Sequence, residues 1–176
     1  MSRLGKYVDD PDPLQMRRSM GRLLSGVSVV TAVDRAGDRH GMTISSLGSI
    51  SLAPPIVMIA LNFDTRTGVA LQETGRFAVS ILGEKQEAIA RRFAVPGGER
   101  FEGGEFEEAP CGIPVVAEAL VQFECEVHGR DVVGDHEVSF GRVVAARFRE
   151  GAPLGFLGGR FGAFQDFGHE MLPWSF

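Results

Sequence analysis

The chain has 176 residues, 44% of them hydrophobic, which fits one compact domain with its own core. The net charge of −5 and the absence of a Lys/Arg block argue against nucleic acid or an anionic membrane as the main partner. The apolar runs are shorter than the ~18 residues that a membrane span needs, and no secretory signal pattern opens the chain, so we expect a cytoplasmic protein.

The first predicted element is a helix that Asp12 caps, that begins at Pro13 and that Gly26 ends. A β-branched strand, Val27–Val33, comes next. The turn 34–38 then leads into a returning strand, Arg39–Ile44. The apolar side chains that share one face of the helix are Met16, Met20, Leu23 and Leu24.

The stretch Gly41–Ser51 reads GMTISSLGSIS and carries five hydroxyl side chains. A hydroxyl donates and accepts hydrogen bonds without carrying charge, so this run could hold a polar ligand. The other interpretation is an ordinary half-buried strand, with Met42 and Ile44 inside and Thr43 and Ser45 in solvent. The next strand, Ile56–Leu61, is apolar throughout and is expected to be buried on both faces.

A polar loop follows, in which Thr67 is expected to cap a short helix that Gly75 ends. The strand 77–82 and the helix 84–94 come next, and the glycine-rich excursion 95–114 shows no period. The remaining segments are an alternating strand at 121–128, a turn at 134–136, a strand at 138–148 and a last short strand near residue 161. Many strands with few, short helices indicate an antiparallel barrel or sandwich.

Several classes of site are excluded by what the sequence lacks. No G-x-G-x-x-G motif opens a helix, no serine has the G-x-S-x-G context, and the four histidines lack metal-ligand spacing. Cys111 and Cys125 are too few for a disulfide framework, and the alternation around Cys125 makes it a core residue.

A phosphate site is better supported. Ser49, Ser51, Arg66 and Thr67 are credible donors, with backbone N–H groups at the start of the short helix adding to them, although Arg66 alone would read as a solvated loop residue. Arg92 and Arg100 are weaker candidates. His136 is either a turn residue satisfied by the backbone or a donor that orients a carboxamide or supplies a proton.

Taken together and in order, these segments resemble the flavin reductase family, whose FMN-binding split barrel supplies reduced flavin to two-component monooxygenases. The resemblance runs from about Met20 to Phe164. The matching pieces are SGVSVVT at 25–31, GMTISS at 41–46, SISL at 49–52 with Pro54 and Pro55, RFA at 92–94, Cys125, GDH at 134–136 and Gly141.

The resemblance implies a mainly β protein with short helices, built as a six-stranded antiparallel split barrel of Greek-key type spanning residues 13–164. Residues 1–12 would form an N-terminal extension and 165–176 a C-terminal tail. It also implies a homodimer with flavin sites near the subunit interface. Two departures stand out: Gly48 replaces a residue that more often has a side chain, and Phe161 has no hydroxyl where relatives can carry tyrosine.

By position, the resemblance assigns FMN or FAD to one connected set of residues. His136 would act on the nicotinamide side and is the catalytic candidate. The flavin-binding candidates are Thr43, Ser45 and Ser46 along the ring and ribityl chain, Ser49 and Ser51 near the phosphate, Asn62, Arg66 and Thr67 on a second phosphate-facing loop, with Arg92 and the aromatic Phe161. No metal is expected.

The implied activity is an NAD(P)H:flavin oxidoreductase that passes hydride from NADH or NADPH to the flavin and serves a partner oxygenase. The alternative is a flavin-binding or electron-transfer module on the same barrel, because fold does not fix function. The sequence does not choose between FMN and FAD or between NADH and NADPH.

Overall fold

The computed structural model describes residues 7–97, 99–165 and 168. Its helices are α1 (Pro13–Met20), α2 (Arg66–Thr74), the 3-10 turn η1 (Glu84–Gln86) and α3 (Glu87–Ala94). Its strands are β1 (Ser25–Gly26), β2 (Ser28–Val33), β3 (Arg39–Ile44), β4 (Gly48–Leu52), β5 (Pro55–Asn62), β6 (Arg76–Ile81), β7 (Phe106–Glu108), β8 (Pro114–Val116), β9 (Val121–Val133), β10 (His136–Phe148), β11 (Leu154–Leu157) and β12 (Arg160–Ala163).

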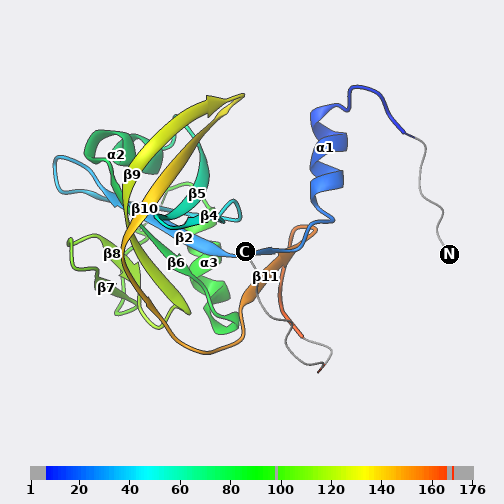
Figure 1. The fold of residues 1–176 in the computed structure, drawn as a ribbon. Helices are drawn as coiled ribbons and strands as arrows, with labels where there is room; N and C mark the ends of the chain where they lie inside the picture. Colours follow the sequence, from blue (N-terminus) through cyan, green and yellow to red (C-terminus); the bar gives the residue numbers. More distant parts are fainter. Residues whose placement is uncertain (1–6, 98, 166–167, 169–176) are drawn as a thin grey trace.

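The architecture is a seven-stranded antiparallel sheet with the order β3-β2-β6-β9-β10-β5-β4, accompanied by two small sheets, β1-β11-β12 and β7-β8 (Figure 1). The prediction of a mainly β, antiparallel protein with short helices is therefore confirmed. The main sheet has seven strands, where the resemblance implied six. This order leaves β3 and β4 as the two edge strands of the main sheet.

Helix α1 is capped as predicted but ends earlier. The Asp12 carboxylate accepts from the Gln15 backbone N–H at 2.7 Å, and the Gln15 side chain accepts from the Asp12 N–H at 3.0 Å. The helix ends at Gly21, so the prediction that it continues to Gly26 was wrong; residues 25–26 form β1 instead. No residue of α1 is buried, and the helix stands apart from the body in Figure 1.

The core lies on the inner face of the main sheet. β2 is buried along most of its length, as its β-branched sequence predicted, and Gly37 takes the positive φ of 90° that the β2-β3 turn requires. β5 was expected to be buried on both faces, and this was wrong: Val57, Ile59 and Leu61 are buried, whereas the alternate residues are half-exposed. This alternation is what an antiparallel strand with one covered face shows.

The strands β9 and β10 form the longest pair and turn at Gly134, whose φ is 63°. Near the middle of β10, Gly141 allows the ring of Phe77 to approach the backbone: a Cβ atom there would lie 2.3 Å from Cζ of Phe77. Phe77 is fully buried, so the glycine in this strand is a packing requirement.

The excursion 95–114 is folded where the sequence showed no period. β7 and β8 pair with each other, and three phenylalanine rings meet at its base, with centroids 5.2 Å (Phe93 to Phe101), 5.6 Å (Phe93 to Phe106) and 5.3 Å (Phe101 to Phe106) apart. The two-stranded β7-β8 hairpin and this aromatic cluster hold the excursion against α3. Apart from residues 165 and 168, the predicted tail 165–176 lies outside the described residues.

Candidate functional site

A cavity of about 420 Å³ lies beside the edge strand β3. One wall is the first half of β3, a second is the start of α2, and a third is the end of α3 with the residues that follow it. Its volume falls in the range of about 300–1,000 Å³ that small-molecule sites occupy. The residues that line it are Arg39, His40, Gly41, Met42, Thr65, Arg66, Thr67, Phe93, Ala94, Pro96, Gly97, Glu99, Arg100 and Phe101.

The β3 wall is held close to α3 because residue 41 has no side chain. A Cβ atom on Gly41 would lie 2.7 Å from the Phe93 ring, and the Gly41 carbonyl accepts from the Arg100 guanidinium at 2.5 Å. The same guanidinium donates to the Val95 carbonyl at 2.7 Å. Arg100 therefore bonds two neutral carbonyls and keeps its positive charge at the cavity wall.

The α2 wall is positioned by Thr65, which caps the helix. Its hydroxyl accepts from the Gly68 N–H at 3.1 Å and donates to the Asn62 carbonyl at 2.9 Å. The prediction that Thr67 is the cap was wrong: Thr67 lies inside the first turn and is 3% exposed. Because two threonines stand two residues apart, either one could have been chosen from the sequence.

Thr67 is a polar residue of the cavity wall whose side chain makes no hydrogen bond to a described residue. Every fully enclosed side-chain nitrogen or oxygen in the described part of the chain has a hydrogen-bond partner. The Thr67 hydroxyl makes no hydrogen bond to any described residue, so it is not fully enclosed, and Thr67 is one of the residues that line the cavity. The backbone N–H groups of Arg66 and Thr67 likewise donate to no described residue, as expected for the start of a helix.

The charges around the cavity are mostly basic. Arg39 pairs with Glu108 at 2.9 Å and His40 bonds Asp34 at 2.8 Å. This contact with His40, together with backbone N–H donors in the turn, holds the pKa of Asp34 below its ordinary value. Arg66 is exposed and makes no ion pair among the described residues, so its charge is available to a ligand.

The hydroxyl run divides into bonded and exposed side chains. Thr43 donates to the Ala90 carbonyl of α3 at 2.7 Å, and Ser46 bonds both the carbonyl and the N–H of Ala60, at 3.0 and 3.1 Å. Ser45 and Ser49 are exposed and Ser51 is half-exposed, and none of these three makes a side-chain hydrogen bond to a described residue. The free hydroxyls of this run are therefore those of residues 45, 49 and 51.

Gly48 begins β4 opposite Met58. A Cβ atom at Gly48 would lie 3.5 Å from Cε of Met58, which is an ordinary contact. The departure at residue 48 therefore leaves room for a side chain and does not reflect crowding.

Asn62 and His136 face each other across the β5-β10 pair, which brings two predicted site residues together. They belong to the same end of the sheet as the start of α2. The His136 ring Nδ1 lies 2.7 Å from the Asp135 carboxylate, and its side chain is 46% exposed. The hydrogen bond with His136 holds the pKa of Asp135 below its ordinary value.

Arg92 and Phe161 lie apart from the cavity. Arg92 makes a two-pronged bond to Glu105 at 2.7 and 3.1 Å, which raises the pKa of Arg92 and lowers that of Glu105. This arginine anchors the excursion and is not free for a phosphate. Phe161 packs on Phe156 in the small sheet and lies under Arg91 of α3, 5.1 Å from the ring centroid.

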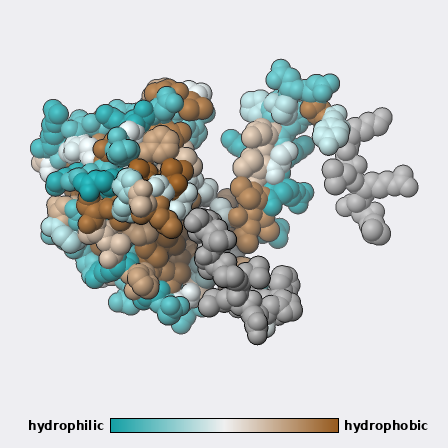
Figure 2. Space-filling model, in the orientation of Figure 1, coloured by the Kyte–Doolittle hydropathy of each residue, from teal (hydrophilic) through white to brown (hydrophobic). Residues whose placement is uncertain are grey.

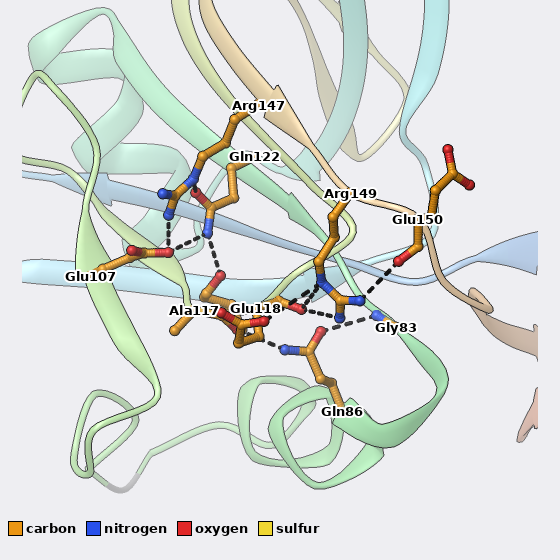
Figure 3. Close-up of polar contacts among 10 residues, drawn as sticks. Gly83, Gln86, Glu107, Ala117, Glu118, Gln122, Arg147, Arg149 and Glu150 are labelled. Carbon is orange, nitrogen blue, oxygen red and sulfur yellow. Dashed lines mark hydrogen bonds and ion pairs between the residues drawn. The ribbon is translucent and has the colours of Figure 1, made fainter.

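A second hollow, about 180 Å³, lies at the other end of β9 and β10. Its polar groups are already satisfied: Arg147 bonds Glu107 and Gln122, and Arg149 bonds the Glu118 carbonyl (Figure 3). This network ties the β7-β8 hairpin and the β8-β9 connection to the main sheet. Among the described residues, no group of three or more His, Cys, Asp or Glu could hold a metal ion.

The sequence pattern missed two basic residues of the cavity, Arg39 and His40, and marked Arg100 only as a weaker candidate. Arg39 and His40 lie on a strand whose alternation gives no sign that its edge borders a cavity. Arg100 stands in a segment without a period, where only its charge marked it. Residues 39, 40 and 100 come together because α3 packs on the edge strand β3, a contact that only the tertiary fold creates.

The chain matches a known protein family. The model of the flavin reductase like domain matches residues 20–165. The chain is 40% identical over 146 residues to the NADH:riboflavin 5'-phosphate oxidoreductase of Streptomyces pristinaespiralis, covering 80% of this chain and 83% of that one. It is 30% identical over 164 residues to the reductase subunit of a flavin-dependent monooxygenase of Rhodococcus jostii, covering 93% of this chain and 84% of that one.

Among solved structures, the chain is similar to the NADH:FAD oxidoreductase of Streptomyces globisporus C-1027 in complex with NAD and FAD fragments. The TM-score is 0.85 at 34% identity, and the match covers 94% of this chain and all of that one (100%).

Proposed function

This chain belongs to the flavin reductase-like domain family, and we propose from this premise that it is an NADH-dependent flavin reductase that supplies reduced flavin to a monooxygenase. The observation that carries the proposal is the 40% identity to an NADH:riboflavin 5'-phosphate oxidoreductase over most of both chains. Flavin bound here would accept the hydride of the nicotinamide, and the protein's part is to bind and orient the two molecules.

The residues of the site fit a flavin in two respects. Uncharged hydroxyls at Ser45, Ser49 and Ser51 are free to bond a polar chain and a phosphate. At the start of α2, the unpaired Arg66 guanidinium and two unbonded N–H groups would hold negative charge. The structure also leaves Ser46 and Arg92 engaged within the protein, so we assign them to holding the site together instead of to flavin contacts.

We assign His136 to the nicotinamide side. Its ring is partly accessible and is oriented by the neighbouring Asp135 carboxylate. Held in this way, an imidazole could donate a hydrogen bond to a carboxamide or transfer a proton. Replacement of His136 by alanine should raise the KM for NADH or lower turnover while flavin affinity stays near that of the wild type.

The finer features that family resemblance implies are also proposals. The Ser46 hydroxyl joins the end of β3 to β5, and we propose that this contact completes a split barrel.

We also propose a homodimer, because α1 and the segment after it leave apolar side chains exposed: Leu14, Met16, Met20, Leu23 and Leu24. In the orientation of Figure 2, apolar surface also gathers on the side of the body that faces this helix.

Two free cysteines support a cytoplasmic location, where thiols stay reduced.

Absorbance of the nicotinamide band tests the function directly. The purified protein is mixed with NADH or NADPH and with FMN or FAD, in all four combinations, and the oxidation rate is measured against a blank without protein. NADH oxidation with at least one flavin is expected. No oxidation in any combination would refute the reductase function, and a yellow protein with that result would support the flavin-binding module instead.

Within the described part of the chain, no helix is long and apolar enough to cross a membrane.

A further inference from the structure

We propose that Glu137 is a positioning residue for the hydride transfer: it ties the strand that carries His136 to helix α2, whose first turn contributes to the flavin site. The inference rests on the proposed function and deepens it, because it concerns how the nicotinamide side and the flavin side are kept at one separation. Glu137 follows His136 in β10, and successive side chains of a strand point to opposite faces. Glu137 therefore acts on the site through the backbone of β10 and through His136.

The Glu137 carboxylate joins three elements of the fold. The side-chain amide of Gln72 on α2 donates to Oε2 at 3.1 Å, and the hydroxyl of Ser139 on β10 donates to Oε1 at 3.3 Å. The guanidinium of Arg130 on β9 lies 3.9 Å from Oε1. The side chain of Glu137 is 13% exposed, so water competes little for these contacts.

The bond from Gln72 links α2 to a part of the sheet on which the helix does not mainly rest. Helix α2 packs on β2 and β3. Among the residues that the structure describes, Gln72 to Glu137 is the one side-chain hydrogen bond between α2 and the β9-β10 pair. A backbone bond, from the Val127 N–H to the Gly75 carbonyl at 2.9 Å, joins β9 to the residue that ends α2. The Gln72 bond is the link that a side-chain substitution can remove.

The end of β10 that carries His136 has little other support. β9 pairs with β6 as far as Glu126, and its later residues pair, within the described chain, only with β10. The ladder between β5 and β10 stops at the pair Asn62 and His136. In Figure 1 the far end of the β9-β10 pair extends past the neighbouring strands. Segments with few packed neighbours open most readily, so a tie one residue from His136 restrains the part of the strand that most needs it.

Stability alone does not account for the placement of Glu137. Removing a carboxylate from water is costly, and the cost is offset only where its partners are close and well aligned. Glu137 has one amide, one hydroxyl at 3.3 Å and the Arg130 guanidinium at 3.9 Å. Glu105, in contrast, receives two bonds from Arg92 at 2.7 and 3.1 Å. We therefore assign the contacts of Glu137 to holding a geometry.

NADH oxidation at saturating flavin tests the inference with two substitutions at one position. Glu137→Leu removes the acceptor, and kcat/KM for NADH should fall about 10-fold, since displacement of reacting groups by about 1 Å can cost about 100-fold. Glu137→Gln keeps a side-chain oxygen that can accept from Gln72, so its kcat/KM should stay within about 2-fold of the wild type. An equal loss in both variants would overturn the inference.

The partner and the histidine supply two further tests by double substitution. Gln72→Leu should lower kcat/KM as much as Glu137→Leu, and the double variant should lose no more, because both changes break one contact. In a His136→Ala background, Glu137→Leu should cost nothing further. Additive losses in either pair would show that Glu137 acts separately, and would overturn the inference.

Arg142→Gln is the matched control on the same strand. Arg142 bonds Glu126 of β9 at 2.7 Å and pairs with Ile56 at the opposite end of the β5-β10 ladder from His136. Its loss removes a charged contact within the same strand pair, and kcat and KM should stay at the wild-type values. A fall like that of Glu137→Leu would overturn the assignment to one end of the pair.

Urea unfolding and flavin titration on the same samples separate positioning from a purely structural role. Flavin affinity should stay near that of the wild type in Glu137→Leu, because the free hydroxyls and the start of α2 are unchanged. A lowered urea midpoint with wild-type kcat and KM would make Glu137 a structural residue and overturn the inference. A wild type that oxidises no NADH would refute the reductase function itself, whereas an active wild type with unchanged variants would refute this inference alone.

Discussion

Replacing Ser46 with alanine removes the one hydroxyl that bonds both backbone groups of Ala60 on β5. The loss of two hydrogen bonds, each worth about 0.5–1.5 kcal/mol, should lower the free energy of unfolding by about 1–3 kcal/mol. For a chain of this size, roughly 2–4 °C per kcal/mol places the fall in Tm at about 2–12 °C. Because this hydroxyl is engaged within the protein, the Kd for flavin should change little.

Ser45→Ala is the matched control, one residue away. Ser45 is exposed and makes no side-chain hydrogen bond to a described residue, so the free energy of unfolding should stay within about 0.5 kcal/mol of the wild type while flavin affinity falls. Urea unfolding followed by circular dichroism and calorimetric flavin titration measure the two quantities on the same samples. A Ser46→Ala protein that is as stable as the wild type but binds flavin poorly would refute our assignment of Ser46 to the fold.

Three further changes have clear expected outcomes. Gly141→Ala should lower unfolding free energy by about 1–3 kcal/mol in a urea titration, because its Cβ would meet the buried Phe77 ring; the loss should shrink when Phe77 is also replaced by leucine. Burial raises the pKa of Cys125 to about 12, so a thiol reagent at neutral pH should label it only after unfolding, as mass spectrometry would show. The hydrogen bond with His40 lowers the pKa of Asp34. The free energy of unfolding of the wild type should therefore exceed that of Asp34→Asn above the ordinary aspartate pKa, and this difference should disappear as pH falls through the lowered pKa. Urea midpoints at several pH values would show it.

Local signals in the sequence were sufficient for most strands and caps. Such signals predicted the helix cap at Asp12, the turns or helix end at the glycines 37, 75 and 134, which take positive φ, and the strand that the alternation of residues 121–128 indicates. In each case the cause is the residue's own side chain or its backbone freedom. The end of α1 was missed because Gly21 and Gly26 both suit a helix end, and pairing of residues 25–26 with β11 favours the earlier stop. Intrinsic helix propensity depends on residue type alone and carries no information about such a tertiary contact.

In the candidate site, some placements could also be predicted from nearby residues, whereas others depend on contacts that only the fold creates. The conjunction of Asn62, Arg66 and Thr67 follows from one loop and was expected, and His136 joins Asn62 through strand pairing. The engagement of Ser46 by Ala60 and of Arg92 by Glu105 depends on residues 13 or 14 positions away in the chain. A hydroxyl or guanidinium looks available in a sequence until its partner in the fold is known.

The contact between Arg100 and the Gly41 carbonyl has a consequence for solubility. β3 is an edge strand, and an unprotected edge offers backbone groups to which a strand of another molecule can add. Here the guanidinium occupies the carbonyl of Gly41, and α3 packs along the same strand, so the open backbone is shielded. Loss of the Arg100 side chain would leave that edge open to strand addition, and light scattering of the Arg100→Ala protein would detect the resulting aggregates.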